Sequence, residues 1–406
     1  MSLPAPSNAQ PNVALATNAY EGRQALSGFF ISGLLVSFLG AILPSWGYHL
    51  RSEFTIVGAY FLSVNGGIIL SLPVAQWLLP RKGIRLALML ACGIAATSFL
   101  SLAFASEPDW AAWRPLGLFW IGFGAGLLNA AVLQAISPLY QHDRAATVNL
   151  AGTLFGSGCL LMALMVAGTY YVYTVPSILI LLAAIPTLYI AVYFRTSFSE
   201  IRAEHQLAIQ DVLKDFRNPG VVLFTLLLFF QFGNEWSIAG WLPLFLIRRL
   251  GISPETSLTL LALFWAALLI GRIAAQVILK RMNRGSLLMS SILSALLGCI
   301  ILDSTANKFG AVMGILFVGG GFASIYPLVL DRIADRFPYY HPGFYSGIFS
   351  LAFTGGLLAP WTLGYFANTW GIRAVMIVPL IGTCVVFVLS LLIMLEAKLS
   401  GGEGAG

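Results

Sequence analysis

Charge is what this chain lacks most. Only 9% of its 406 residues are Asp, Glu, Lys or Arg, whereas a soluble domain carries about 25%. Hydrophobic residues make up 58%, and the mean hydropathy is +0.86. No soluble fold of this size could bury so much apolar surface, so the composition predicts a polytopic membrane protein that contacts the lipid bilayer. The net charge of +6 does not indicate nucleic acid, because the basic residues lie in short clusters between apolar runs.

Motifs for catalysis, metal binding or nucleotide binding are also scarce in this sequence. The four cysteines lie inside apolar runs without the spacing of a metal or redox site, and are expected to be small packing residues: Cys92, Cys159, Cys299 and Cys384. The four histidines lie at the ends of these runs or between them, and no phosphate-binding loop is present, which excludes an ATP-driven pump. We therefore expect neither an enzyme nor a protein with a cofactor or a metal.

Twelve apolar runs are each long enough to cross a bilayer, which takes about 20 residues. They cover residues 25–47, 54–79, 86–106, 115–140, 145–170, 174–194, 220–246, 255–279, 286–304, 309–331, 344–367 and 373–395. The sequence thus predicts an all-α membrane protein of twelve transmembrane helices in two six-helix halves. The predicted parts are a disordered tail, two bundles with a linker between them, and a second tail: 1–24, 25–194, 195–219, 220–396 and 397–406.

The distribution of Lys and Arg predicts the orientation. With both termini inside, fifteen of these residues face the cytoplasm and six face outside, which favours cytoplasmic termini in a plasma (inner) membrane protein. In the linker, an i, i+3, i+4, i+7 pattern from Ile209 to Phe216 predicts an amphipathic helix on the membrane surface. The pair Asn218-Pro219 is typical of an N-cap and first residue of the seventh span.

Glu235 lies about midway along the seventh span, where a carboxylate costs roughly 2.5–3.5 kcal/mol or more. Gln231 and Asn234 are spaced to share a helix face with it, and Trp241 lies nearby. Such a face suits a sugar, because amide and carboxylate groups bind hydroxyls and an indole stacks on the ring. Three roles stay open for Glu235: a solute ligand, a proton-coupling site, or a structural residue held by neighbouring donors.

Four further residues are candidates for the solute site because they are polar or aromatic residues within spans: Asn129, Asn149, Trp265 and Tyr326. The alternative for the asparagines is interhelical hydrogen bonding, and for the aromatic residues it is packing.

Two basic loops occupy the same place in each half, between its second and third spans, at residues 80–85 and 280–285. They predict a cytoplasmic gate that contains Arg81, Arg85 and Arg281. Counted from the inner ends of their spans, Arg272 and Glu235 differ in depth by roughly 11 Å. Arg272 is therefore expected to reach toward the cytoplasm and join this gate with Asp331.

Twelve spans, a division into six and six, and paired basic loops resemble the major facilitator superfamily. Within it, Gly122–Ala131, Asn149–Ala151 with Gly158, Gly233–Glu235 with Gly240-Trp241, and Gly355-Gly356 with Pro360 are similar to the fucose permease and glucose/galactose porter branch. The resemblance implies a secondary transporter that is a monomer. It implies a small-molecule solute, a hexose-type monosaccharide, with H⁺ or Na⁺ as possible coupling ions.

The chain also departs from this branch. Gly40 and Asn129 occupy positions where the proton-coupled fucose permease type has carboxylates, Gly152 replaces a Gln, and Pro80 replaces the Asp of the first basic loop. Glu235 is then the leading candidate for coupling, and a symporter and a facilitator both stay open. The alternative is an exporter of amphipathic compounds such as drugs or lysolipids, which the polar face around Glu235 disfavours.

Overall fold

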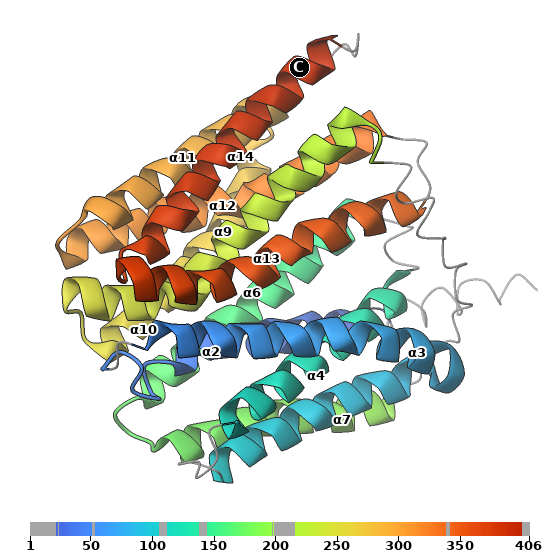
Figure 1. The fold of residues 1–406 in the computed structure, drawn as a ribbon. Helices are drawn as coiled ribbons and strands as arrows, with labels where there is room; N and C mark the ends of the chain where they lie inside the picture. Colours follow the sequence, from blue (N-terminus) through green and yellow to red (C-terminus); the bar gives the residue numbers. More distant parts are fainter. Residues whose placement is uncertain are drawn as a thin grey trace, which may run out of the picture. The chain divides into compact units, whose positions relative to one another are not determined.

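In a computed structural model, the chain is all-helical over the residues that the structure describes, which are 22, 24–50, 53–104, 112–137, 144–196, 198, 216–337 and 342–399. Its helices are α2 (Gly28–Ile42), α3 (Phe54–Phe104), α4 (Trp113–Ala135), α6 (Arg144–Thr169), α7 (Val175–Arg195), α9 (Pro219–Leu250), α10 (Pro254–Ile278), α11 (Arg284–Ser304), α12 (Lys308–Arg336), α13 (Pro342–Trp370) and α14 (Ala374–Leu399) (Figure 1). Eleven helices in this part of the chain are long and apolar enough to cross a membrane.

Helix α3 accounts for the twelfth crossing. Its 51 residues would span about 76 Å, more than twice the hydrocarbon thickness of a bilayer. The helix is interrupted at Gly83, whose φ of 80° and ψ of 166° lie in a region that glycine adopts readily. The segments before and after Gly83 match the predicted spans 54–79 and 86–106. The prediction of twelve spans is therefore confirmed.

The seventh span begins as predicted. The side chain of Asn218 accepts a hydrogen bond of 2.9 Å from the backbone N–H of Gly220, and Pro219 is the first helical residue of α9. The amphipathic pattern predicted for residues 209–216 lies outside the described residues except for Phe216. So do the two predicted tails, apart from residues 22, 24 and 397–399.

The helices form two compact units. The first comprises the described residues of 1–36, 66–158 and 179–203, and the second those of 37–65, 159–178 and 204–406. Within the second unit α9 packs against α13 and α14, and α12 packs against α10 and α11. This unit also contains the C-terminal part of α2 and the N-terminal part of α3, so these residues pack with the seventh to twelfth spans. The predicted boundaries of the two six-helix bundles stay a prediction.

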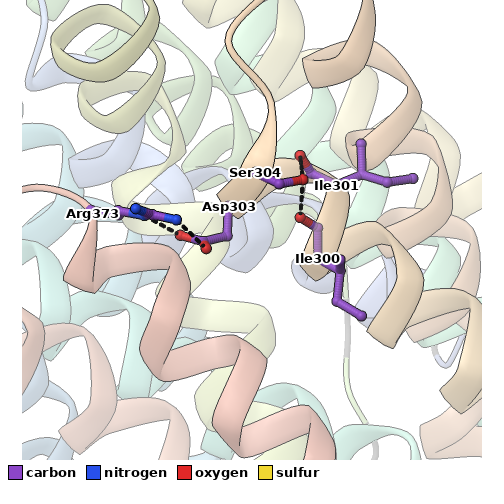
Figure 2. Close-up of polar contacts among 5 residues, drawn as sticks. All are labelled: Ile300, Ile301, Asp303, Ser304 and Arg373. Atoms are coloured by element: carbon purple, nitrogen blue, oxygen red, sulfur yellow. Dashed lines mark hydrogen bonds and ion pairs between the residues drawn. The ribbon is translucent and has the colours of Figure 1, made fainter.

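An ion pair joins α11 to the turn before α14 at one end of the second unit. Arg373, in the turn before α14, binds Asp303 near the end of α11 through two hydrogen bonds of 2.9 Å, from Nε to Oδ1 and from Nη2 to Oδ2 (Figure 2). Beside it, the Ser304 hydroxyl donates to the carbonyl oxygen of Ile300, four residues earlier in α11, at 2.7 Å (Figure 2). These contacts fix the turn between α13 and α14 to the end of α11.

Candidate solute site

Gln231 and Glu235 form the centre of the candidate site on α9. Gln231 is fully buried, and Glu235 is 8% exposed. The Gln231 side chain lies next to the Glu235 carboxylate, one helical turn away. Within the described part of the chain, neither the amide nitrogen nor the amide oxygen of Gln231 has a partner with normal hydrogen-bond geometry. A buried amide without partners costs free energy, so this position is suited to a polar ligand.

Arg272 lies close to this carboxylate, and the charge of Arg272 acts directly on Glu235. The depth difference expected from the sequence assumed that the N-terminal end of α9 and the C-terminal end of α10 lie at the same level. Helix α9 has 32 residues and α10 has 25, and residues 251–253 join the C-terminal end of α9 to the N-terminal end of α10. Counted from this turn, Glu235 lies about 22 Å and Arg272 about 27 Å down, a difference of roughly three residues. The gate role of Arg272 stays a prediction.

Two small residues that the sequence analysis did not select as site residues, Cys159 and Ser37, also belong to this part of the second unit. Cys159, in the part of α6 that belongs to the second unit, lies beside Ser37 and is near enough to Glu235 and Arg272 to be affected by their charges. Both residues are buried. Nothing in the local sequence marks Ser37, because a serine in a span is common and usually bonds its own helix.

The Asn234 side chain points toward α14. Its Nδ2 donates to the hydroxyl of Thr383 on α14 at 3.3 Å. A Cβ on Gly382 would lie 2.1 Å from its Oδ1, so α14 passes directly over this side chain. The predicted three-residue face is therefore divided in this structure, with Gln231 and Glu235 grouped together and Asn234 at the contact with α14.

Trp241 is fully buried between helices. Its indole N–H donates to the carbonyl oxygen of Pro360 on α13 at 2.9 Å. Its ring stacks on Phe61 with a centroid distance of 5.9 Å and an interplanar angle of 26°. In this conformation its polar atom and one ring face are both occupied by the protein.

Trp265 on α10 has a different environment. It is 1% exposed, and its indole nitrogen has no hydrogen-bond partner in the described part of the chain. Its ring lies 6.0 Å from that of Trp236 at an angle of 59°. Tyr326 is half-buried between Phe232 and Phe349, with centroid distances of 5.4 and 5.9 Å. The N–H of Trp265 is thus a second buried polar atom available to a ligand.

Asn129 and Asn149 belong to the first unit, on α4 and α6, and both side chains are half-buried. Two of the predicted gate residues lie in this unit as well. Arg85 donates from Nη2 to the carbonyl oxygen of Phe194 and lies over its ring, 4.9 Å from the centroid. Arg81 lies over the exposed ring of Trp77 at 4.8 Å. These contacts bind the first basic loop to its own unit.

In the second unit, the basic loop forms an ion pair through a residue that the sequence analysis did not select. Arg284 binds Asp335 near the end of α12 at 2.8 Å, and its charge also acts on the half-buried Asp331. Arg281 is exposed. Arg336 binds Glu396 on α14 at 3.2 Å, so α12 is joined to both α11 and α14 at this end. Pairing between loops depends on side-chain direction, which residue spacing alone does not give.

Comparison with known proteins identifies the family of this chain. The family model of the Major Facilitator Superfamily matches residues 2–163 and 145–360. An uncharacterised MFS-type transporter of Yersinia pestis is 23% identical over 84% of this chain and 87% of its own length. A glucose/mannose transporter of Bacillus subtilis is 22% identical over 66% of this chain and 70% of its own length.

Solved structures agree on the fold. A D-xylose-proton symporter has a TM-score of 0.71 at 17% identity and covers 92% of this chain and 96% of its own. The fucose:proton symporter of E. coli has a TM-score of 0.61 at 15% identity and covers 93% of this chain and 99% of its own. The expected resemblance is confirmed, and with it the expectation that the protein is not an enzyme: the chain belongs to the Major Facilitator Superfamily and is a multi-pass membrane transporter.

Proposed function

We propose that this transporter moves a monosaccharide of hexose size across the inner membrane by alternating access. The observation that carries the proposal is Gln231, a fully buried amide beside the Glu235 carboxylate, neither of whose polar atoms has a partner with normal hydrogen-bond geometry among the described residues. It lies beside the Glu235 carboxylate in the middle of a membrane-spanning helix. An amide and a carboxylate together donate to and accept from hydroxyl groups, which a monosaccharide presents in a dense array.

The relatives support the same class of solute. The relative from Bacillus subtilis is a glucose/mannose transporter, and two proteins with the same fold are symporters for xylose and fucose. We propose that Gln231, Glu235 and Trp265 bind the solute in the second unit. Asn129 and Asn149 are the proposed solute-binding residues of the first unit. Tyr326 would line the path. The proposed cytoplasmic gate residues are Arg81 and Arg85 in the first unit and Arg281 and Asp331 in the second, and both termini are proposed to lie in the cytoplasm.

Glu235 is the proposed coupling residue. A buried carboxylate whose neighbour is an arginine can change its protonation state when the charge on that arginine is redirected. Proton coupling through Glu235 would allow symport although Gly40 and Asn129 replace the carboxylates of the fucose permease type.

Counterflow in proteoliposomes tests this proposal. We expect a radiolabelled monosaccharide, drawn from a panel of hexoses and their C6 derivatives, to enter liposomes preloaded with the unlabelled sugar. Accumulation should require a pH gradient and be indifferent to Na⁺. In Glu235→Gln, exchange should persist while gradient-driven accumulation is lost. Absence of exchange for every member of the panel would overturn the proposal, and efflux of amphipathic dyes instead would favour an exporter.

A further inference from the structure

A group of positive charges lies at the break in α3, in the first unit. Arg81, Lys82 and Arg85 flank Gly83, where the helix is interrupted, and Arg195 is the last residue of α7. All four basic residues are exposed. Among the described residues of the first unit there is no aspartate or glutamate, so no carboxylate of this part of the chain balances their charge.

Contacts between α3 and α7 bring these residues to one surface. Arg85 donates from Nη2 to the carbonyl oxygen of Phe194, the residue before Arg195, and its guanidinium lies 4.9 Å from the centroid of the Phe194 ring. Further along the two helices, a Cβ on Gly93 would lie 3.9 Å from Cδ1 of Ile190, so they lie side by side (Figure 1). The break in α3 and the end of α7 therefore form a single basic surface.

An exposed apolar face of α3 leads up to this surface. Its members are spaced i, i+4, i+7 and i+11, which places them on one side of the helix, and all are exposed: Leu70, Val74, Trp77 and Arg81. The guanidinium of Arg81 lies over the Trp77 ring, 4.8 Å from its centroid. Tryptophans in membrane proteins gather where the acyl chains meet the headgroups. Arg81, one turn beyond Trp77, therefore lies at the depth of the lipid headgroups.

The corresponding loop of the second unit pairs with carboxylates of its own unit. There Arg284 binds Asp335 at 2.8 Å, and Arg336 binds Glu396 at 3.2 Å. In the first unit, the guanidinium of Arg81 contacts an aromatic ring but no acceptor in the described part of the chain. A guanidinium carries five N–H donors and an ammonium three, and the oxygens of one phosphate can accept from several of them at once.

We propose that the basic surface, formed by Arg81, Lys82, Arg85 and Arg195 with Trp77 at its edge, binds the headgroup of an anionic phospholipid. The lipid phosphate accepts hydrogen bonds from cations of both helices, and the acyl chains lie along the apolar face that ends at Trp77. A zwitterionic phospholipid also brings a positive group, which the four cations repel, so the surface selects net negative charge. Lipid binding here does not depend on which solute the transporter moves.

Lipid titration of the purified full chain in detergent tests the selectivity. Phosphatidylglycerol and phosphatidylcholine with identical acyl chains would be added separately, and bound lipid would be counted by native mass spectrometry. We expect phosphatidylglycerol to bind about tenfold or more tightly, because several cations act on its net charge. Equal binding of the two lipids would overturn the proposal.

Inorganic phosphate separates a lipid from a free anion. At the concentration of the lipid, it should leave the bound phosphatidylglycerol in place, because it lacks the acyl chains that lie along Leu70 and Val74. Complete displacement of the lipid by phosphate would assign the surface to a free phosphate group, and the lipid assignment would be wrong.

Matched substitutions locate the site. Arg81→Gln combined with Lys82→Gln should lose most of the preference for phosphatidylglycerol. Arg249→Gln combined with Lys308→Gln removes two exposed cations from the second unit and should keep the preference. Arg195→Gln changes the other helix and should weaken the preference by a few-fold, which provides a second variant if the first folds poorly. The Tm of each variant without lipid checks its fold. An unchanged preference in the variants of the first unit, or an equal loss in the variant of the second, would contradict this placement of the lipid.

Discussion

The indole N–H of Trp241 on α9 donates to the carbonyl oxygen of Pro360 on α13 at 2.9 Å. The bond joins two helices at a buried position, and Trp241 also stacks on Phe61 from the N-terminal part of α3. Three segments far apart in the sequence therefore meet at one indole. This contact gives Trp241 a packing role that a Trp at this place in the sequence does not reveal.

Trp241→Phe should lower the free energy of unfolding by about 1–2 kcal/mol, from the lost interhelical hydrogen bond and the lost ring volume. Trp265→Phe is the matched variant, because Trp265 is equally buried but its N–H has no partner in the described residues. Trp265→Phe should lower the free energy of unfolding less than Trp241→Phe does, and it should lower the solute affinity more. Thermal unfolding in detergent and solute titration measure the two effects. A larger stability loss in Trp265→Phe would contradict this assignment.

Gly364 on α13 sits against Gly58 on α3. A Cβ on Gly364 would lie 2.6 Å from the Cα of Gly58 and 2.8 Å from the carbonyl oxygen of Phe54, so backbone would have to move. Gly364→Ala should destabilise the protein by about 1–3 kcal/mol through overpacking. A Cβ on Gly320 would meet no atom within 4 Å, so Gly320→Ala should not lower the stability and should add helix propensity. Equal midpoints in thermal unfolding for the two variants would show that the α3–α13 contact can relax freely.

His49, in the turn after α2, gives a pH dependence outside the membrane spans. Burial lowers its pKa from the ordinary 6.5, a hydrogen bond to the backbone of Pro44 partly offsets this, and the positive charge of Arg248 lowers it further. The folded state then binds fewer protons at His49 than the unfolded state. The contribution of His49 to the free energy of unfolding should be fully present above pH 6.5 and should decrease as the pH falls below that value. The Tm of the wild type should drop more than that of His49→Gln between pH 7.5 and 5.5, and parallel curves would contradict the assignment.

Much of the fold follows from the sequence because apolar run length dictates the spans. The basic loop around Gly83 separates two spans, and Asn218-Pro219 begins the seventh as its capping chemistry predicts. Both features are local, so neighbouring residues suffice to determine them. Glu235 was likewise recognisable from its cost in an apolar segment.

The arrangement of the site is less predictable because it depends on neighbouring helices. Asn234 shares an ideal face with Gln231, yet α14 passes over it and Thr383 takes its hydrogen bond. Arg272 lies near Glu235, a proximity that apolar run lengths alone did not reveal. Ser37 and Cys159 reach this place through the packing of α2 and α6, which no motif records.

The central claim is that the face of α9 with Gln231 and Glu235 binds the solute, and one calorimetric comparison on this helix tests it most directly. The sugar that exchanges best would be titrated into wild type, Gln231→Ala and Asn234→Ala. Gln231→Ala should lose about tenfold or more in affinity, because it removes the amide proposed to bind the solute. Asn234→Ala should keep its affinity and lose about 0.6 kcal/mol of stability with its bond to Thr383. Unchanged affinity in Gln231→Ala, or an equal loss in both variants, would contradict the account.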